Sequence, residues 1–195
     1  MNGAGTDQIY LWKDCLYVPL HAVRLAAGPF LPASLNEAEQ HVRLPPDFRF
    51  GVRDRSVGGV QLPRRGLAAA RVHGDSMVNL DVYHGDIAIF QRHDYGFLKN
   101  RKVVVIEKVG DDEGWGAWAL KRLLIKRSQS AESENETDWD EPVITLLSAN
   151  SNVSPAELDP SGQYRVHGIF LRSVRRDSAV LVNSATIRHR VMHEK

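Results

Sequence analysis

Short apolar and β-branched runs, separated by turn-forming residues, dominate the second half of the chain. Between residues 68 and 174 these runs are broken by Gly, Asp and Asn. Runs of this length with such breaks predict β-strands rather than helices. Their spacing predicts a mainly β fold, a compact, twisted, mostly antiparallel sheet assembly. The predicted strands are residues 68–72, 87–91, 102–109, 115–125, 143–147 and 164–174.

The N-terminal part of the chain follows a less regular pattern. Residues 1–14 carry Gly, Asn and charged residues with little periodicity, which is typical of a mobile arm. Residues 15–25 are apolar, β-branched and aromatic and predict a strand, which the prolines that follow it prevent from continuing. Residues 34–40 begin with a serine and place Glu37 three residues later, a capping-box pattern that predicts a short helix.

Two long polar segments interrupt the apolar pattern. Residues 43–66 are rich in Pro and Arg, and residues 128–141 are acidic and nearly free of large apolar side chains. Both compositions predict surface loops inserted between elements of the fold. The sequence therefore divides into an arm over residues 1–27, one domain over residues 28–175 and a tail over residues 176–195.

Composition narrows the class of protein. With 195 residues and 43% apolar residues the chain can build one sizeable core. Its formal net charge of +1 produces no overall electrostatic attraction to nucleic acids or anionic lipids. Sequence-specific DNA binding is therefore not expected. The single Cys15 excludes an internal disulfide, and no metal or cofactor is expected, because His189 and His193 have no third ligand nearby. Without an apolar run of roughly 18 residues or a signal-peptide pattern, a cytoplasmic location is expected and membrane insertion is not.

One turn carries a candidate nucleophile. Ser76 follows Gly74 and Asp75 and precedes Met77, at the point where a predicted strand ends. A serine on such a turn can point its hydroxyl outward while nearby backbone N–H groups face a developing oxyanion. The N–H groups of Ser76 and Met77 are the candidate donors. Turns of this composition are common, so the motif alone leaves an ordinary turn open.

A lysine within an apolar run is the second candidate. Strand alternation sends Lys121 to one face and Leu120 and Arg122 to the other. If the face of Lys121 is interior, its ammonium loses hydration and its pKa falls. The neutral amine can then take the proton from a serine hydroxyl. Without the serine motif, the pattern favours a surface lysine on an edge strand.

Together these segments resemble the LexA/UmuD family of self-cleaving serine peptidases. The resemblance implies the fold of the LexA C-terminal and UmuD domains, with Ser76 as nucleophile, Lys121 as general base and the bond between Ala27 and Gly28 as the cleavage site. The interval between Ser76 and Lys121 is longer than usual for the family, and residues 110–114 are the obvious hairpin insertion. In the family's order, the matching segments are Leu25-Ala26-Ala27-Gly28, Gly74-Asp75-Ser76-Met77 followed by Gly85-Asp86, Leu120-Lys121-Arg122-Leu123, Leu146-Leu147-Ser148-Ala149-Asn150-Ser151 and Val166-His167-Gly168-Ile169-Phe170.

The same resemblance implies a biological setting. Residues 1–27 are too few for a helix-turn-helix domain, so the architecture is closer to UmuD, in which a short arm is removed. The resemblance implies a homodimer, with the strand over residues 164–174 as a possible contact, and a role in bacterial DNA-damage (SOS) control or mutagenic repair. It also implies stimulation by a RecA nucleoprotein filament, and a translesion polymerase or the transcription machinery as partner.

Two other classes of protein stay open. The first is a non-enzymatic dimeric regulatory or assembly module that keeps the peptidase fold. The intact Ser76, Lys121 and Ala27-Gly28 argue against it, because a binding module has no reason to retain all three. The second is a membrane signal peptidase with a similar dyad, which the missing anchor disfavours.

Overall fold

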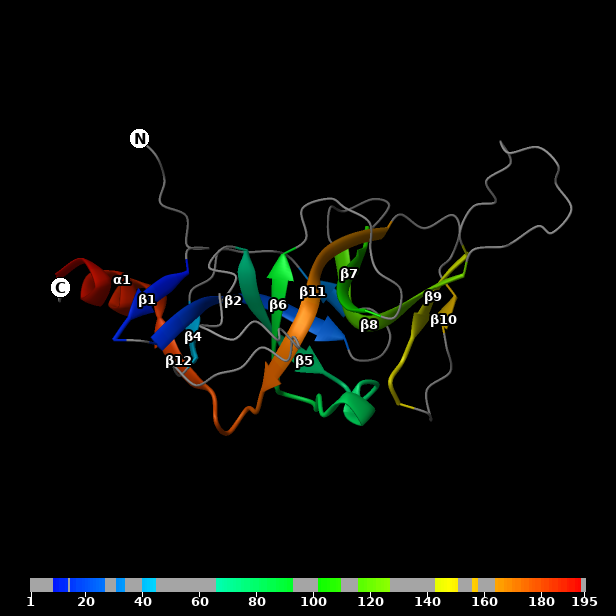
Figure 1. Cartoon of the computed structure of the whole chain (residues 1–195), viewed down its shortest axis with the longest axis horizontal. Coiled ribbons are helices and arrows are strands. Elements are labelled where there is room, and N and C mark those ends of the chain that lie inside the picture. The colour runs from blue at the N-terminus through cyan, green and yellow to red at the C-terminus, as the bar shows by residue number, and fades with distance from the viewer. Residues whose placement is uncertain are drawn as a thin grey trace, which may run out of the picture.

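The computed structural model describes residues 9–13, 15–26, 31–33, 40–44, 66–92, 102–109, 116–126, 143–150, 156–157 and 164–193. These residues form a mainly β structure with one α-helix, α1 (Ser184–His193), and a 3₁₀ turn over Val78–Leu80 (Figure 1). The strands are β1 (Tyr10–Trp12), β2 (Cys15–Ala26), β3 (Leu31–Ala33), β4 (Gln40–Leu44), β5 (Leu67–His73), β6 (Ile87–Arg92), β7 (Val103–Lys108), β8 (Gly116–Lys126), β9 (Val143–Leu147), β10 (Ala156–Glu157), β11 (Tyr164–Val174) and β12 (Val180–Asn183).

Six of the strands form a closed barrel. Their hydrogen-bonded order is β8-β7-β11-β6-β5-β2, and β2 returns to β8 through the pair formed by Ala26 and Ala119. Neighbours in this ring are antiparallel, except that β2 runs parallel to both β5 and β8. The predicted mainly β, mostly antiparallel sheet assembly is therefore confirmed. All six strands predicted between residues 68 and 174 are present, as β5 to β9 and β11.

The interior of the barrel is the main hydrophobic core. All six strands of the ring contribute to one apolar cluster. Five of them provide buried residues such as Leu25, Val72, Phe90, Val105 and Leu120, and β11 packs Phe170 against these residues. Alternate residues of a strand face opposite sides of a sheet, so only the inside of the ring can collect side chains from every strand. This packing fixes the relative positions of β5 and β8, the two strands that carry the candidate residues.

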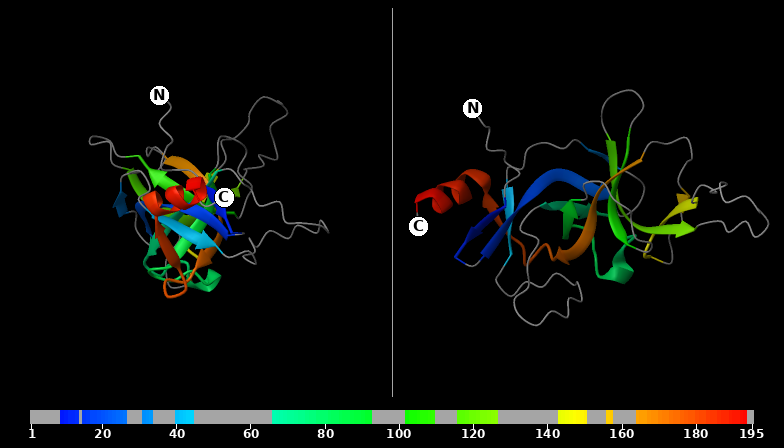
Figure 2. Two further views of the ribbon diagram at one scale, coloured as in Figure 1. Left: turned by 90° about the vertical axis from the view of Figure 1, so that its left-hand side faces the viewer. Right: turned by 45° about the horizontal axis from the view of Figure 1, so that its top comes forward.

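A second layer extends β2 beyond the barrel. The first half of β2 pairs with β1 and β4, and β12 pairs with the far edge of β4. Helix α1 covers this end, where Ile187 packs with Tyr10, Cys15 and Tyr17. In Figure 1 and in the right-hand view of Figure 2, α1 and β1 lie at one end of the molecule and β9 and β10 at the opposite end.

The structure differs from the sequence-based division at both ends of the chain. β1 and β2 belong to the sheet, although residues 1–27 were expected to form an arm, and β2 is one of the strands that closes the barrel. β12 and α1 occupy most of the expected tail over residues 176–195. The apolar repeats of β12 and α1 are short, and they predict these elements only when the partners β4 and β1 are known. No helix of the described residues is long and apolar enough to cross a membrane.

Several loop predictions fall largely outside the described residues. Of the helix expected over residues 34–40, only Gln40 is described, and it begins β4 instead. The loop expected over residues 43–66 is described only at its two ends, where Arg43 and Leu44 finish β4 and Gly66 precedes β5. The acidic segment over residues 128–141 lies outside the described residues.

Candidate active site

The turn that carries Ser76 begins where β5 ends. Two backbone hydrogen bonds of 2.8 Å close its base, from the Val72 N–H to the Asp86 carbonyl and from the Gly85 N–H to the Val72 carbonyl. Gly74 and Gly85 have φ angles of 97° and 86°, in the region that residues with a Cβ atom rarely adopt. The glycines therefore allow a tight loop that leaves the barrel and returns to it as β6.

Ser76 is buried at the start of this loop. Ser76 is only 1% exposed, and its Oγ makes no hydrogen bond. Buried hydroxyls are nearly always paired, and leaving one unpaired costs about 1–3 kcal/mol. No hydrogen bond joins this oxygen to the Lys121 amine in the structure. An unsatisfied buried hydroxyl is available to a base and to a substrate carbonyl.

Lys121 lies on the face of β8 that points away from the barrel interior, the same face as Ala119 and Leu123. The residue is 5% exposed, and burial lowers the pKa of its amine below the ordinary lysine value. Ala119 and Leu123 belong to one apolar cluster and Leu120 to the barrel interior, so alternation along β8 is as predicted. None of the ion pairs found among the described residues involves Lys121. Burial therefore destabilises the charged ammonium of Lys121 relative to that of an exposed lysine.

A turn after β9 links the two candidate residues. The β8–β9 ladder ends with the pair of Arg122 and Leu147, so Ser148 is the first residue after the ladder and Lys121 is the next residue of β8. The Ser148 hydroxyl in turn donates a hydrogen bond of 2.5 Å to the backbone carbonyl of Ser76. The fold thus brings the Ser76 turn against the end of β9, which pairs with β8 at Arg122, the neighbour of Lys121.

The candidate cleavage site, Ala27 and Gly28, lies outside the described residues, but both flanks are described. Ala26, the last residue of β2, pairs with His73 on β5 and with Ala119 on β8. β3, which follows the site, is antiparallel to β8, with its first residue paired to Trp118. The chain therefore contacts β8 immediately before the site and again three residues after it, on the strand that carries Lys121.

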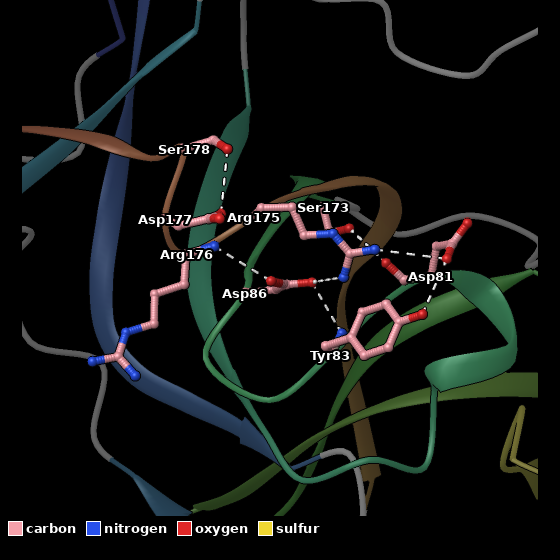
Figure 3. A network of polar contacts seen from close by, with 8 residues as sticks. All are labelled: Asp81, Tyr83, Asp86, Ser173, Arg175, Arg176, Asp177 and Ser178. Atoms are coloured by element: carbon pink, nitrogen blue, oxygen red, sulfur yellow. Dashed lines mark hydrogen bonds and ion pairs between the residues drawn. The ribbon is translucent and has the colours of Figure 1, made fainter.

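A polar network missed by the sequence analysis holds the far side of the loop (Figure 3). Asp86, which is 3% exposed, accepts hydrogen bonds from the Tyr83 N–H at 3.0 Å, the Arg175 guanidinium at 3.1 Å and the Arg176 N–H at 3.3 Å. Arg175 also lies 3.6 Å from Asp81 and covers the Tyr83 ring at 4.0 Å. The connection between β11 and β12 thereby anchors the loop, and no local pattern in the sequence indicates this pairing.

Replacing the carboxylate at the centre of this network is expected to destabilise the protein. Asp86→Ala leaves three donors without their acceptor and should lower the free energy of unfolding by about 2–3 kcal/mol. Asp177→Ala removes an exposed carboxylate whose hydrogen-bond partner among the described residues is Ser178, and should change the free energy of unfolding by less than about 0.5 kcal/mol. Urea unfolding followed by tryptophan fluorescence measures both. Equal midpoints for the two variants would contradict the anchoring role.

Two histidines near the site have structural partners. His84 Nδ1 accepts a hydrogen bond of 3.1 Å from the Gly74 N–H, which ties the two ends of the loop together. His167 lies 2.7 Å from the Glu107 carboxylate and stacks on Trp118 with ring centroids 3.8 Å apart. Burial lowers the pKa of His167 despite the neighbouring carboxylate. In the described ranges no cluster of three His, Cys, Asp or Glu residues is placed to hold a metal ion.

Comparison with protein-family models finds no match to this chain, and comparison with curated proteins finds none either. Assignment of a function therefore depends on the site itself and on the motif resemblance. The site brings together a buried, unpaired serine hydroxyl, a buried lysine with a lowered pKa and a chain segment that returns to the lysine strand.

Proposed function

We propose that this protein is a serine endopeptidase that cuts its own chain between Ala27 and Gly28. Ser76 is the nucleophile and Lys121 the general base. The observation that carries the proposal is the arrangement of an unpaired buried hydroxyl and a desolvated lysine around the single turn that contains Ser148. The LexA/UmuD type of peptidase fold belongs to the same proposal and is supported by the order of the matching segments.

The chemistry follows from a neutral lysine. The Lys121 amine accepts the Ser76 proton as the serine oxygen attacks the Ala27 carbonyl carbon, and backbone N–H groups of Ser76 and Met77 bind the resulting oxyanion. The Lys121 ammonium then gives its proton to the departing Gly28 nitrogen, which leaves an ester between Ala27 and Ser76. Lys121 next deprotonates a water that attacks this ester, releasing the Ala27 carboxylate and restoring the serine hydroxyl.

The flanking strands support cleavage within one chain. Ala26 and β3 both pair with β8, so the connection between them begins and ends beside the strand of Lys121. Holding the bond and the nucleophile in one molecule replaces an encounter between two chains with a local rearrangement, which allows a weak nucleophile to suffice.

Substitution of the nucleophile tests this proposal. Ser76→Ala is expected to leave the fold intact and abolish cleavage, because no other group supplies the attacking oxygen. Gly28→Glu is expected to block cleavage as well, because a large charged side chain must enter the site. Intact-mass measurement after mild alkaline incubation detects a fragment that begins at Gly28. Ser178→Ala, on an exposed turn, is the matched control and should cut normally; undiminished cutting by Ser76→Ala would refute the assignment.

The setting implied by the resemblance is part of the proposal. It comprises a homodimer, a cytoplasmic location, a role in bacterial DNA-damage (SOS) control or mutagenic repair, stimulation by a RecA nucleoprotein filament, and a translesion polymerase or the transcription machinery as partner. β11 pairs with β7 through its first half and with β6 through its second half. Within β11, only Gly168 and Ile169 have strand partners on both sides, which is compatible with a strand contact between two copies.

The alternative is a non-enzymatic dimeric regulatory or assembly module. One observation favours it: the Ser76 hydroxyl makes no hydrogen bond to Lys121. Catalytic hydrogen bonds are often long or poorly aligned in the absence of bound substrate, so the missing hydrogen bond is compatible with the peptidase as well. A wild-type chain that never produces the Gly28 fragment would favour the module.

A further inference from the structure

Two consecutive carbonyl groups of the nucleophile turn point at the same residue. The Asp75 carbonyl accepts the side-chain amide of Asn150 at 3.1 Å. The Ser76 carbonyl accepts the backbone N–H of Asn150 at 2.7 Å and the Ser148 hydroxyl at 2.5 Å. Every one of these donors comes from the short turn that follows β9, so this turn holds the nucleophile turn by hydrogen bonds from one side.

These hydrogen bonds determine where the N–H groups of Ser76 and Met77 point. A trans peptide unit is planar and directs its C=O and N–H bonds to opposite sides. With the carbonyls of Asp75 and Ser76 directed at the β9 turn, the N–H groups of Ser76 and Met77 are directed away from it, side by side. Neither N–H donates a backbone hydrogen bond within the described part of the chain. Adjacent, unpaired N–H groups with a common direction form an anion-binding concavity.

We propose that Ser148 and Asn150 are positioning residues that aim the Ser76 and Met77 N–H groups at the oxyanion. This inference rests on the proposed function and adds to it the residues that build the oxyanion hole. The Ser148 hydroxyl accepts a hydrogen bond from the Asn150 N–H at 3.1 Å, so its single proton is directed to the Ser76 carbonyl. The hydroxyl therefore fixes the orientation of the peptide unit between Ser76 and Met77.

Other hydrogen bonds and packing contacts hold the nucleophile loop, and they remain when the hydrogen bonds from the β9 turn are lost. Its base is closed by the backbone pairing of Val72 with Gly85 and Asp86, and its 3₁₀ turn by N–H groups that donate to the Met77 carbonyl. Met77 itself is buried in the barrel core. Variants at position 148 are therefore expected to fold, with a change confined to the direction of the peptide unit between Ser76 and Met77.

A pair of isosteric substitutions tests the inference. Ser148→Thr keeps the hydroxyl, and Ser148→Val has the same shape without it. Loss of a direct oxyanion donor costs about 10²–10³ in rate, so misdirection of one is expected to lower the S148V self-cleavage rate constant roughly tenfold to a hundredfold. S148T should stay within about threefold of wild type. Asn150→Ala removes the hydrogen bond that the side-chain amide donates to the Asp75 carbonyl. This variant should show a loss like that of S148V.

The pH profile separates positioning from other roles. Because Lys121 is untouched, the pH midpoint of cleavage in S148V should equal that of wild type while the plateau falls. An unchanged plateau in S148V, or a fall that S148T shares, overturns the inference alone. A shifted midpoint with an unchanged plateau also overturns it, because the turn would then act through the base. A wild-type chain that does not cut refutes the proposed peptidase, and this inference with it.

Discussion

Self-cleavage of the wild-type chain is expected to rise with pH and then level off. Only the neutral amine of Lys121 accepts the serine proton, and the neutral fraction grows as the pH passes upward through the amine's pKa. Burial lowers that pKa, so the midpoint should lie below the value of about 10.4 for an exposed lysine. Rate constants from intact-mass time courses between pH 6 and pH 10 measure the profile.

Lys121→Arg is the decisive variant for this prediction. A guanidinium keeps the charge and approximate length but does not deprotonate in this range, so cleavage should be absent at every pH. General-base catalysis contributes about 10²–10⁴ in rate, which sets the expected loss. Lys102→Arg, at an exposed position just before β7, is the matched control and should cut normally. A flat profile or an active K121R chain would exclude lysine as the base and favour the binding module.

Cleavage is expected to leave the two fragments together in one native particle. All of β2 precedes the bond between Ala27 and Gly28, yet β2 pairs with β1, β4, β5 and β8 and closes the barrel. Its side chains Val18, Leu20 and Leu25 are buried in the hydrophobic clusters, and each contributes about 1.5–3 kcal/mol on burial. Dissociation of the N-terminal fragment would expose this surface and open the ring.

Comparison of native and denaturing conditions measures this retention. The two fragments should co-elute in native size-exclusion chromatography and separate after denaturation. Inserting a site-specific protease sequence between Ala27 and Gly28 of the Ser76→Ala chain tests retention without self-cleavage. Loss of the N-terminal fragment from either nicked chain in native buffer would contradict the prediction. Retention would make the product a nicked barrel rather than a core freed of an arm.

Local sequence patterns were sufficient for the elements of the barrel. Short apolar and β-branched runs separated by Gly, Asp and Asn predicted β5 to β9 and β11. Within a strand, successive side chains face opposite sides of the sheet. The same rule predicted that Lys121 and Leu120 face opposite sides of β8, which their environments confirm. Gly74 and Asp75 before Ser76 predicted a turn at the end of β5, and the positive φ of Gly74 shows why glycine is needed there.

The connections between these elements required the tertiary structure. The pairing of Ala26 with Ala119, the hydrogen bond from Ser148 to Ser76 and the contact of Arg175 with Asp86 join residues far apart in sequence. Strand alternation determines which face a side chain occupies but not which strand lies beside it, because the choice of neighbour depends on competition among all strand edges. For this reason the sequence by itself determined the strands and the candidate residues. Only the fold decided that β2, expected to end an arm, closes the barrel beside them.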